Sequence, residues 1–314
     1  MDEFPDALDR CLRQIPRGHV ATCGAIARAL GDVRAARAVA SLLTEHPATP
    51  AAHRVVRADG RPVLPNANHR LASEDVPVRS GRVPANRFVA IRTAVPLLDE
   101  LRREQRHLAS LVTEEDVGGP AERIAGVDVA YDADRMYAAA VCVGATTLAV
   151  VEVATATGTV SFPYIPTYLA RREFPGIEAA VRRLPRKPDV LLVDGHGRLH
   201  PALFGVACDV GVRLDIPTIG VAKHPLAGRP MKPSRGDRDA IPIALGGETR
   251  GYAWVPPGAG RPIFVSVGHR ISLATALDLV KRTTRSRYPE PLALADRASK
   301  EMKRNEKREK GAKR

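Results

Sequence analysis

The chain has 314 residues, more than one average domain, so its length predicts two compact units joined by a linker. Hydrophobic residues make up 44% and charged residues 26%, which excludes the polar composition of a disordered protein. The formal net charge of +13 favours a polyanionic partner, nucleic acid before a membrane surface, because Lys and Arg that contact phosphates release condensed counterions. The lack of an eighteen-residue apolar run and the acidic N-terminus argue against a transmembrane helix and a signal peptide, so we expect a cytoplasmic protein.

The four cysteines, Cys11, Cys23, Cys142 and Cys208, lie far apart in the sequence. Zinc knuckles and disulfide frameworks need closely spaced or patterned cysteines, so the spacing indicates neither kind of site.

The first part of the chain predicts a small DNA-binding fold. A break at Gly31-Asp32 separates helical spacing over residues 22–30 from helical spacing over 33–43, which is the layout of a helix-turn-helix. Residues 47–96 are rich in Pro, Gly, Asn and Arg and indicate loops and a wing. We therefore expect a winged helix-turn-helix-like domain over residues 1–85 and a linker over 86–95.

The remainder predicts a larger α/β domain over residues 96–298. A helix over 96–112 precedes three strands of a meander, and helices and strands then alternate, which favours a mixed sheet with flanking helices. The strands are expected at 123–131, 137–143, 148–155, 190–193 and 218–221, and the later helices at 173–184, 202–214 and 272–285.

The last residues, 299–314, form a basic run. From Lys300 to Arg314 there are eight basic and three acidic residues. Runs of like charge are commonly solvated, so we expect a disordered tail whose charge serves solubility as much as binding.

Three carboxylates occupy unusual places in the second domain. Asp128 lies inside an apolar strand and Asp194 ends another, where a charge is costly unless it is paired or bound to a metal. Glu173, at the start of the helix between them, could join them at one edge of the sheet. Such a set suits magnesium ions, which can activate water against a phosphodiester. Taken singly, each carboxylate could equally be a strand-end or helix-cap residue.

Other polar side chains follow predicted strands. His196 and His200 lie in the glycine-containing segment after Asp194, where they could touch phosphate or product. Lys223 ends one strand and His269 follows the apolar run 263–267. Strand ends are where α/β enzymes carry their chemistry.

Five segments of this domain resemble the endonuclease V family in order and spacing, and the resemblance extends over residues 97–296. Tyr164 and Glu173 are nine residues apart, and Glu173 and Asp194 are twenty-one apart. The five segments are Pro163-Tyr164-Ile165-Pro166, Arg171-Arg172-Glu173, Val193-Asp194-Gly195-His196-Gly197, Gly220-Val221-Ala222-Lys223 and Gly268-His269-Arg270.

The resemblance implies an RNase H-like fold and a DNA repair endonuclease in which Asp128, Glu173 and Asp194 bind Mg²⁺, with Mn²⁺ able to substitute. It implies hydrolysis of double-stranded DNA at the second phosphodiester on the 3′ side of deoxyinosine, leaving 3′-hydroxyl and 5′-phosphate ends. Other deaminated bases, single-stranded DNA and RNA remain open as substrates.

The same resemblance implies how DNA would be held. The tyrosine of the segment 163–166 would act as a wedge, filling the space left when hypoxanthine turns into a pocket. Lys223 would orient the attacking water or contact the scissile phosphate, with His200 and His269 assisting nearby. The segment alone indicates only a rigid turn that exposes a tyrosine.

Residues 4–80 resemble the DNA-binding domain of alkylguanine-DNA alkyltransferases. The matching segments are Ile15-Pro16-Arg17-Gly18, Gly24-Ala25-Ile26-Ala27, Ala35-Ala36-Arg37-Ala38-Val39 and His53-Arg54-Val55-Val56. That family carries its reactive thiolate in a Pro-Cys-His-Arg motif, whereas Ala52 stands at the cysteine position here and offers no nucleophile. Cys23 replaces a tyrosine that helps to rotate the nucleotide, and His46 replaces the asparagine of the hinge.

Arg37 matches the arginine finger that enters the base stack in that family. The small side chains around it would let its helix lie close to the minor groove. The alternative is an ordinary alanine-rich helix with Arg34 and Arg37 in solvent.

Three other functions are considered besides that of a repair nuclease. An alkyltransferase needs cysteine at position 52, which is alanine. A non-catalytic lesion-binding protein has no need of Asp128, Glu173, Asp194 and Lys223 together. An inosine-specific ribonuclease would use the same residues on RNA.

Overall fold

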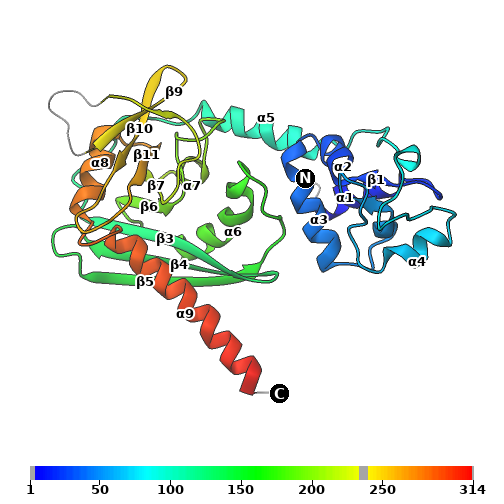
Figure 1. Cartoon of the computed structure of the whole chain (residues 1–314). Coiled ribbons are helices and arrows are strands. Elements are labelled where there is room, and N and C mark those ends of the chain that lie inside the picture. The colour runs from blue at the N-terminus through cyan, green and yellow to red at the C-terminus, as the bar shows by residue number, and fades with distance from the viewer. Residues whose placement is uncertain (1–3, 233–239, 313–314) are drawn as a thin grey trace. The chain divides into compact units, whose positions relative to one another are not determined.

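The computed structural model describes residues 4–232 and 240–312, and by the contacts among its residues the chain divides into two units. The first unit is Met1–Glu104 with Ser161–Pro166, and the second is Gln105–Val160 with Thr167–Arg314. Figure 1 shows the elements of both. Within the described residues, no helix is both long and apolar enough to cross a membrane.

The first unit is mostly helical. Thr22 caps helix α2 by accepting a hydrogen bond from the Ala25 amide, at 3.0 Å. The predicted break is present at Gly31, whose φ of +101° suits glycine and whose added Cβ would lie 2.7 Å from the Asp99 amide nitrogen. The elements are α1 (Phe4–Leu12), β1 (Ala21–Thr22), α2 (Cys23–Ala29), η1 (Val33–Ala35), α3 (Ala36–Glu45), η2 (Ala52–Arg54), β2 (Val55–Val56), α4 (Ala67–Ala72) and η3 (Ala85–Arg87).

A nine-stranded mixed sheet forms the second unit, in the order β5-β4-β3-β6-β7-β11-β10-β9-β8. Strand β3 pairs in parallel with β6, and β6 with β7, while the other neighbours are antiparallel. The strands are β3 (Arg123–Asp132), β4 (Arg135–Gly144), β5 (Val150–Thr159), β6 (Val190–Asp194), β7 (Thr218–Ala222), β8 (Arg229–Pro230), β9 (Ala240–Leu245), β10 (Glu248–Trp254) and β11 (Ile263–His269).

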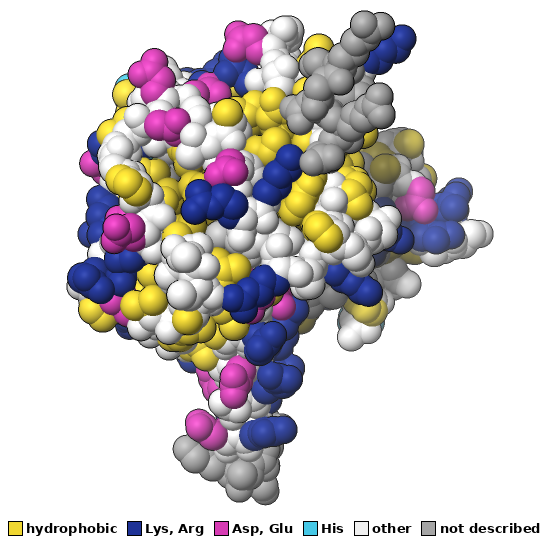
Figure 2. Space-filling model, turned by 90° about the vertical axis from the view of Figure 1, so that its left-hand side faces the viewer, with side chains coloured by type: hydrophobic (Ala, Val, Ile, Leu, Met, Phe, Trp, Pro, Cys, Tyr) yellow, Lys and Arg dark blue, Asp and Glu magenta, His cyan; other side chains and the backbone are white. Residues whose placement is uncertain are grey.

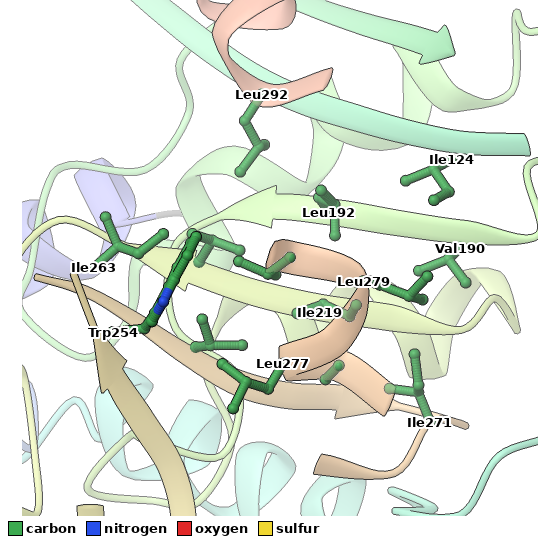
Figure 3. Close-up of a cluster of buried hydrophobic side chains, with 14 of the residues drawn as sticks. Ile124, Val190, Leu192, Ile219, Trp254, Ile263, Ile271, Leu277, Leu279 and Leu292 are labelled. Carbon is green, nitrogen blue, oxygen red and sulfur yellow. The ribbon is translucent and has the colours of Figure 1, made fainter. Parts of the chain in front are cut away.

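Helices cover both faces of this sheet, so its central strands are buried on each side. Along β6, Leu192 packs with α8 and α9 on one face, and Leu191 packs with α6 and α7 on the other. Figure 3 shows the first of these clusters, with Leu192, Leu279 and Leu292 among its members. The helices are α5 (Leu97–Ala109), α6 (Leu169–Val181), α7 (Val206–Leu214), α8 (Leu273–Arg282) and α9 (Glu290–Ala312). The predicted fold class, a mixed sheet with flanking helices, is confirmed.

The structure differs from the predicted elements in three respects. The predicted helix at 173–184 begins earlier, at Leu169, so Glu173 lies one turn inside α6. Strands β9 and β10 were not predicted, because their short segments lack strict alternation.

The disordered tail is the third correction, because residues 299–312 continue helix α9. The Ser299 side chain is buried, and Lys307 forms an ion pair with Asp132 at 2.9 Å. Glu306 forms another with Arg135 at 3.1 Å. The charge run is ordered by partners on β3 and β4 that lie far away in sequence; residues 313–314 lie outside the described residues.

Candidate active site

Two of the predicted carboxylates lie on adjacent parallel strands. Val127 of β3 is in register with Val193 of β6, so the next residue of each strand, Asp128 and Asp194, lies at the same end of the sheet. The pKa of Asp128 is raised by burial and by the negative charge of Asp194, against a hydrogen bond that the Ser299 hydroxyl donates at 2.8 Å.

Glu173 joins this pair from α6, which packs on β3 and β4. Burial raises the pKa of Glu173 to about 8, and the charges of Asp128 and Asp194 add to the shift. The structure therefore brings the three carboxylates together closely enough for Asp128 and Asp194 to oppose the ionisation of Glu173. Like charges in an apolar setting call for a compensating cation.

The compensating charge in the present arrangement is Lys223, directly after β7. Its Nζ lies 2.6 Å from Asp194 Oδ2 and 4.6 Å from the centre of the Tyr288 ring. Burial alone would lower the pKa of Lys223, but the Asp194 carboxylate outweighs it and raises that pKa. The Tyr288 hydroxyl lies 3.0 Å from both Asp194 Oδ1 and Val221 O and can donate its proton to either.

Helix α9 contributes residues that sequence reasoning missed. Ser299 fixes one oxygen of Asp128, and the charge of Asp296 also raises the pKa of Asp128. Both side chains come from one helix face, three residues apart. The spacing of Leu292, Ala295 and Ser299 could have revealed a packed helix face, although not what it packs against.

The donor chemistry suits a hard divalent cation, since carboxylate oxygens are the ligands that magnesium prefers. Across residues 4–232 and 240–312, however, no three Asp, Glu, His or Cys side chains are already arranged as the ligand set of a metal ion. The Lys223 ammonium donates to Asp194 Oδ2, one of the carboxylate oxygens of this group. A cation that used this oxygen as a ligand would therefore have to share it with Lys223 or displace the lysine.

His269 is not brought to the carboxylates. Strand β11 is antiparallel to β7, and His269 pairs with Thr218 at the start of β7, whereas Lys223 follows its end. Five residues of strand separate the two positions, about 16 Å. His269 is buried, and its Nδ1 accepts a hydrogen bond from the Thr113 amide at 3.2 Å. The expectation that His269 assists Lys223 near the scissile phosphate is therefore wrong, and His269 has a structural role instead.

The other two histidines lie in the loop after β6. His200 is buried, and its Nδ1 accepts a hydrogen bond from the Ala202 amide at 3.1 Å, which fixes the loop locally. His196 Nε2 lies 2.9 Å from the carbonyl oxygen of His224, the residue after Lys223. This hydrogen bond joins the loop that follows Asp194 to the loop that carries Lys223.

The predicted wedge segment belongs to the first unit. Ile165 is fully buried, and the Phe162 ring packs edge-on against Phe4 with 5.8 Å between ring centres. Tyr164 between them is 60% exposed. Pro163 is half-buried and Pro166 exposed. An aromatic ring held in solvent by buried neighbours has the accessibility that base stacking requires.

The segment that matches the alkyltransferase acceptor motif is ordered, but it has no thiol at the acceptor position. Ala52 is fully buried at the start of η2, and the next residue, His53, contacts Glu74 through Nε2 at 3.0 Å. Burial raises the pKa of Cys11 and of Cys23 to about 11, so both remain protonated thiols at neutral pH.

Arg37 lies on α3, the second helix of the predicted helix-turn-helix, and its side chain is exposed. The alanine-rich face beside it is partly buried: Ala35 and Ala38 pack in the core of the first unit. The arginine is therefore accessible to a polyanion.

Comparisons with known proteins match both units. The family model of endonuclease V matches residues 106–297, and that of the 6-O-methylguanine DNA methyltransferase DNA-binding domain matches residues 3–74. Endonuclease V of Thermofilum pendens is 45% identical over 201 residues, 63% of this chain and 85% of that protein.

Two solved structures are also similar. The endonuclease V structure from Streptomyces avermitilis is 40% identical with a TM-score of 0.62, covering 67% of this chain and 94% of that one. Endonuclease V of Ciona intestinalis, in complex with a 24-mer DNA containing an inosine followed by a ribo-adenosine, is 27% identical with a TM-score of 0.59. That match covers 66% of this chain and 98% of the other.

Proposed function

Because this chain belongs to the endonuclease V family, we propose that it is a repair endonuclease that cuts DNA at the second phosphodiester 3′ to a deoxyinosine. Its products would carry 3′-hydroxyl and 5′-phosphate ends. The observation that carries the proposal is the half-buried group of Asp128, Glu173 and Asp194, with Lys223 beside it, inside the region that matches the family. The inosine-containing DNA bound by the Ciona relative supports the choice of substrate.

Asp128, Glu173 and Asp194 would hold Mg²⁺, with Mn²⁺ able to replace it. A bound ion of this kind supplies an activated water and stabilises the leaving oxygen of a phosphodiester. The residues of the chain prepare the site: Ser299 fixes Asp128 Oδ2, and Tyr288 lies within hydrogen-bond distance of Asp194 Oδ1. Fixed carboxylate oxygens lower the cost of organising the ligands when the ion binds.

Lys223 would act on the substrate phosphate. Its ammonium is paired with Asp194 and its side chain is about half exposed, so a phosphate bound beside that carboxylate would lie within its reach. In that position it would stabilise charge on the scissile phosphate.

For the first unit we propose a non-catalytic role in binding DNA or its lesions. Ala52 has no nucleophile, and the raised pKa values of Cys11 and Cys23 keep these thiols protonated, so neither can serve as a thiolate acceptor. The exposed Arg37 would contact DNA, and Tyr164 would stack in the strand beside the displaced base.

The test is a cleavage assay with Mg²⁺ on labelled duplexes that carry one inosine, one uracil, one O6-alkylguanine or no lesion, with an inosine RNA in parallel. We expect nicks in the inosine duplex, with sequencing gels locating the cut and phosphatase treatment identifying the ends. Asp128→Ala and Asp194→Ala should abolish nicking and retain duplex binding, because these carboxylates hold metal rather than base.

Three outcomes would contradict the proposal. Substantial nicking by either alanine variant would show that the substituted carboxylate is not needed for catalysis. Binding without nicking by the wild type would support the non-catalytic alternative. Faster cleavage of the RNA would support the ribonuclease.

A further inference from the structure

Helix α9 has one face that packs on the sheet and one that does not. Ser299 contacts Asp128, Lys303 donates to the Tyr131 carbonyl oxygen, and Lys307 pairs with Asp132. These contacts face β3 and the turn that joins it to β4. Beyond them the helix projects past the sheet of its own unit, as Figure 1 shows.

The lysines and arginines of α9 differ in whether they have partners. The described lysines are all paired: besides Lys303 and Lys307, Lys300 contacts Asp296 at 2.7 Å and Lys310 contacts Glu306 at 2.6 Å. The arginines are all exposed, and no hydrogen bond or ion pair within residues 4–232 and 240–312 involves them. These arginines are Arg297, Arg304 and Arg308.

The three arginines line one side of the helix. They are separated by seven and then four residues, which at about 100° per residue places them within about 40° of one another. Glu301 shares this side and leaves a net positive charge on it. We call Arg297, Arg304 and Arg308 the arginine row. Figure 2 shows Lys and Arg side chains gathered along the projecting part of α9.

The arginine row begins at the candidate active site. Asp296 and Ser299, on the same helix, interact with Asp128. From Ser299 to Arg308 the helix rises about 14 Å, since each residue adds about 1.5 Å. Phosphates of one DNA strand recur about every 3.4 Å along the axis, so the distance from Ser299 to Arg308 corresponds to about four base pairs.

We propose that the arginine row binds the phosphate backbone of the DNA substrate, from beside the scissile bond to about four base pairs away. This inference rests on the proposed function, which puts the scissile phosphate at the carboxylates. Nucleic acid is the partner that fits, because several unpaired guanidinium groups along one side of a helix match a row of phosphates, which they bind through two parallel hydrogen bonds. The anchored helix presents them at a fixed distance from the site.

The test is the salt dependence of binding to an inosine duplex, measured by fluorescence anisotropy with the full chain and Ca²⁺ between 50 and 200 mM salt. Arg304→Gln/Arg308→Gln should reduce the slope of log affinity against log salt by about 2, since each phosphate contact contributes about 0.9. The loss of affinity across this salt range should then be about tenfold smaller than for the wild type. Gln retains helix propensity, and circular dichroism checks that α9 persists.

Two further variants isolate the position and the charge. Arg182→Gln/Arg186→Gln also removes two exposed positive charges, but at the end of α6, on the opposite face of the sheet, and should leave the slope unchanged. Arg304→Lys/Arg308→Lys keeps the charge and should keep most of the slope. Undamaged duplex should show the same change as inosine duplex, because phosphate contacts carry no sequence information.

The outcomes separate this inference from the proposed function. If the wild type nicks inosine DNA and Arg304→Gln/Arg308→Gln keeps the wild-type slope, the inference is overturned and the row serves solubility. An equal reduction in the α6 control would also overturn it, because net charge alone would explain the effect. If the wild type does not nick but the slope falls only in the α9 variant, the proposed function fails and DNA binding by α9 stands.

Discussion

Gly126→Ala would test whether the packing of α9 against β3 positions the residues of the active site. A Cβ added at Gly126 would lie 2.3 Å from the Pro291 carbonyl carbon and 2.5 Å from the Leu292 nitrogen. Both are backbone atoms in the first turn of α9, so no side-chain rotation relieves the overlap. Carbon atoms in contact lie about 3.5–4.0 Å apart, so α9 must move by roughly 1 Å.

The displacement should cost both stability and activity. Overpacking of a core typically costs about 1–3 kcal/mol. In a unit of this size each kcal/mol lowers the Tm by about 2–4 °C. Because α9 moves as a rigid helix, the hydrogen bond from Ser299 to Asp128, now 2.8 Å, should lengthen or break. We expect a lower kcat for nicking inosine duplex, with a smaller change in KM.

The matched control is Gly158→Ala on β5 of the same sheet. Its added Cβ would meet Met136 Cγ at 3.4 Å, an ordinary contact with a flexible side chain. Thermal unfolding and single-turnover nicking should therefore show a loss for Gly126→Ala and almost none for Gly158→Ala. Equal Tm and kcat for the two variants would refute the idea that α9 is held against β3 at this point.

The remaining predictions concern the first unit. Tyr164→Ala should lower the preference for inosine over undamaged duplex by about 1–3 kcal/mol, the range of a base-stacking contact, in competition binding assays; unchanged selectivity would remove the wedge role. Glu74 has a pKa of about 2, because Arg54 hydrogen-bonds to it. Since the folded pKa lies below the usual 4.5, Glu74 stabilises the fold above pH 4.5, by up to about 3 kcal/mol, and this is lost as the pH falls towards 2. The Tm deficit of Glu74→Gln should therefore shrink between pH 6 and pH 3, and a constant deficit would contradict the assignment. Arg37→Ala should weaken DNA binding more than Arg10→Ala, which removes an exposed arginine from α1; equal effects would leave Arg37 an ordinary solvated residue.

The sequence by itself determined the central strands and the main candidates for chemistry. The run at 190–193 is apolar throughout, and 218–221 is apolar apart from Thr218, because both faces of β6 and β7 are covered by helices. This local pattern can be recognised without the fold. Asp128 and Asp194 stood out because a charge within or at the end of such a strand needs a partner.

The tertiary structure decided which residues meet. His269 follows an apolar strand much as Lys223 does, but β11 runs antiparallel to β7, and strand direction is set by pairing that no local pattern encodes. Ser299, Asp296 and Tyr288 reach the carboxylates only because α9 and the segment before it pack across β3 and β6. The composition of α9 does not indicate that it is ordered, because the residues that hold it lie about 170 positions earlier in the sequence. These residues are Asp128, Asp132 and Arg135.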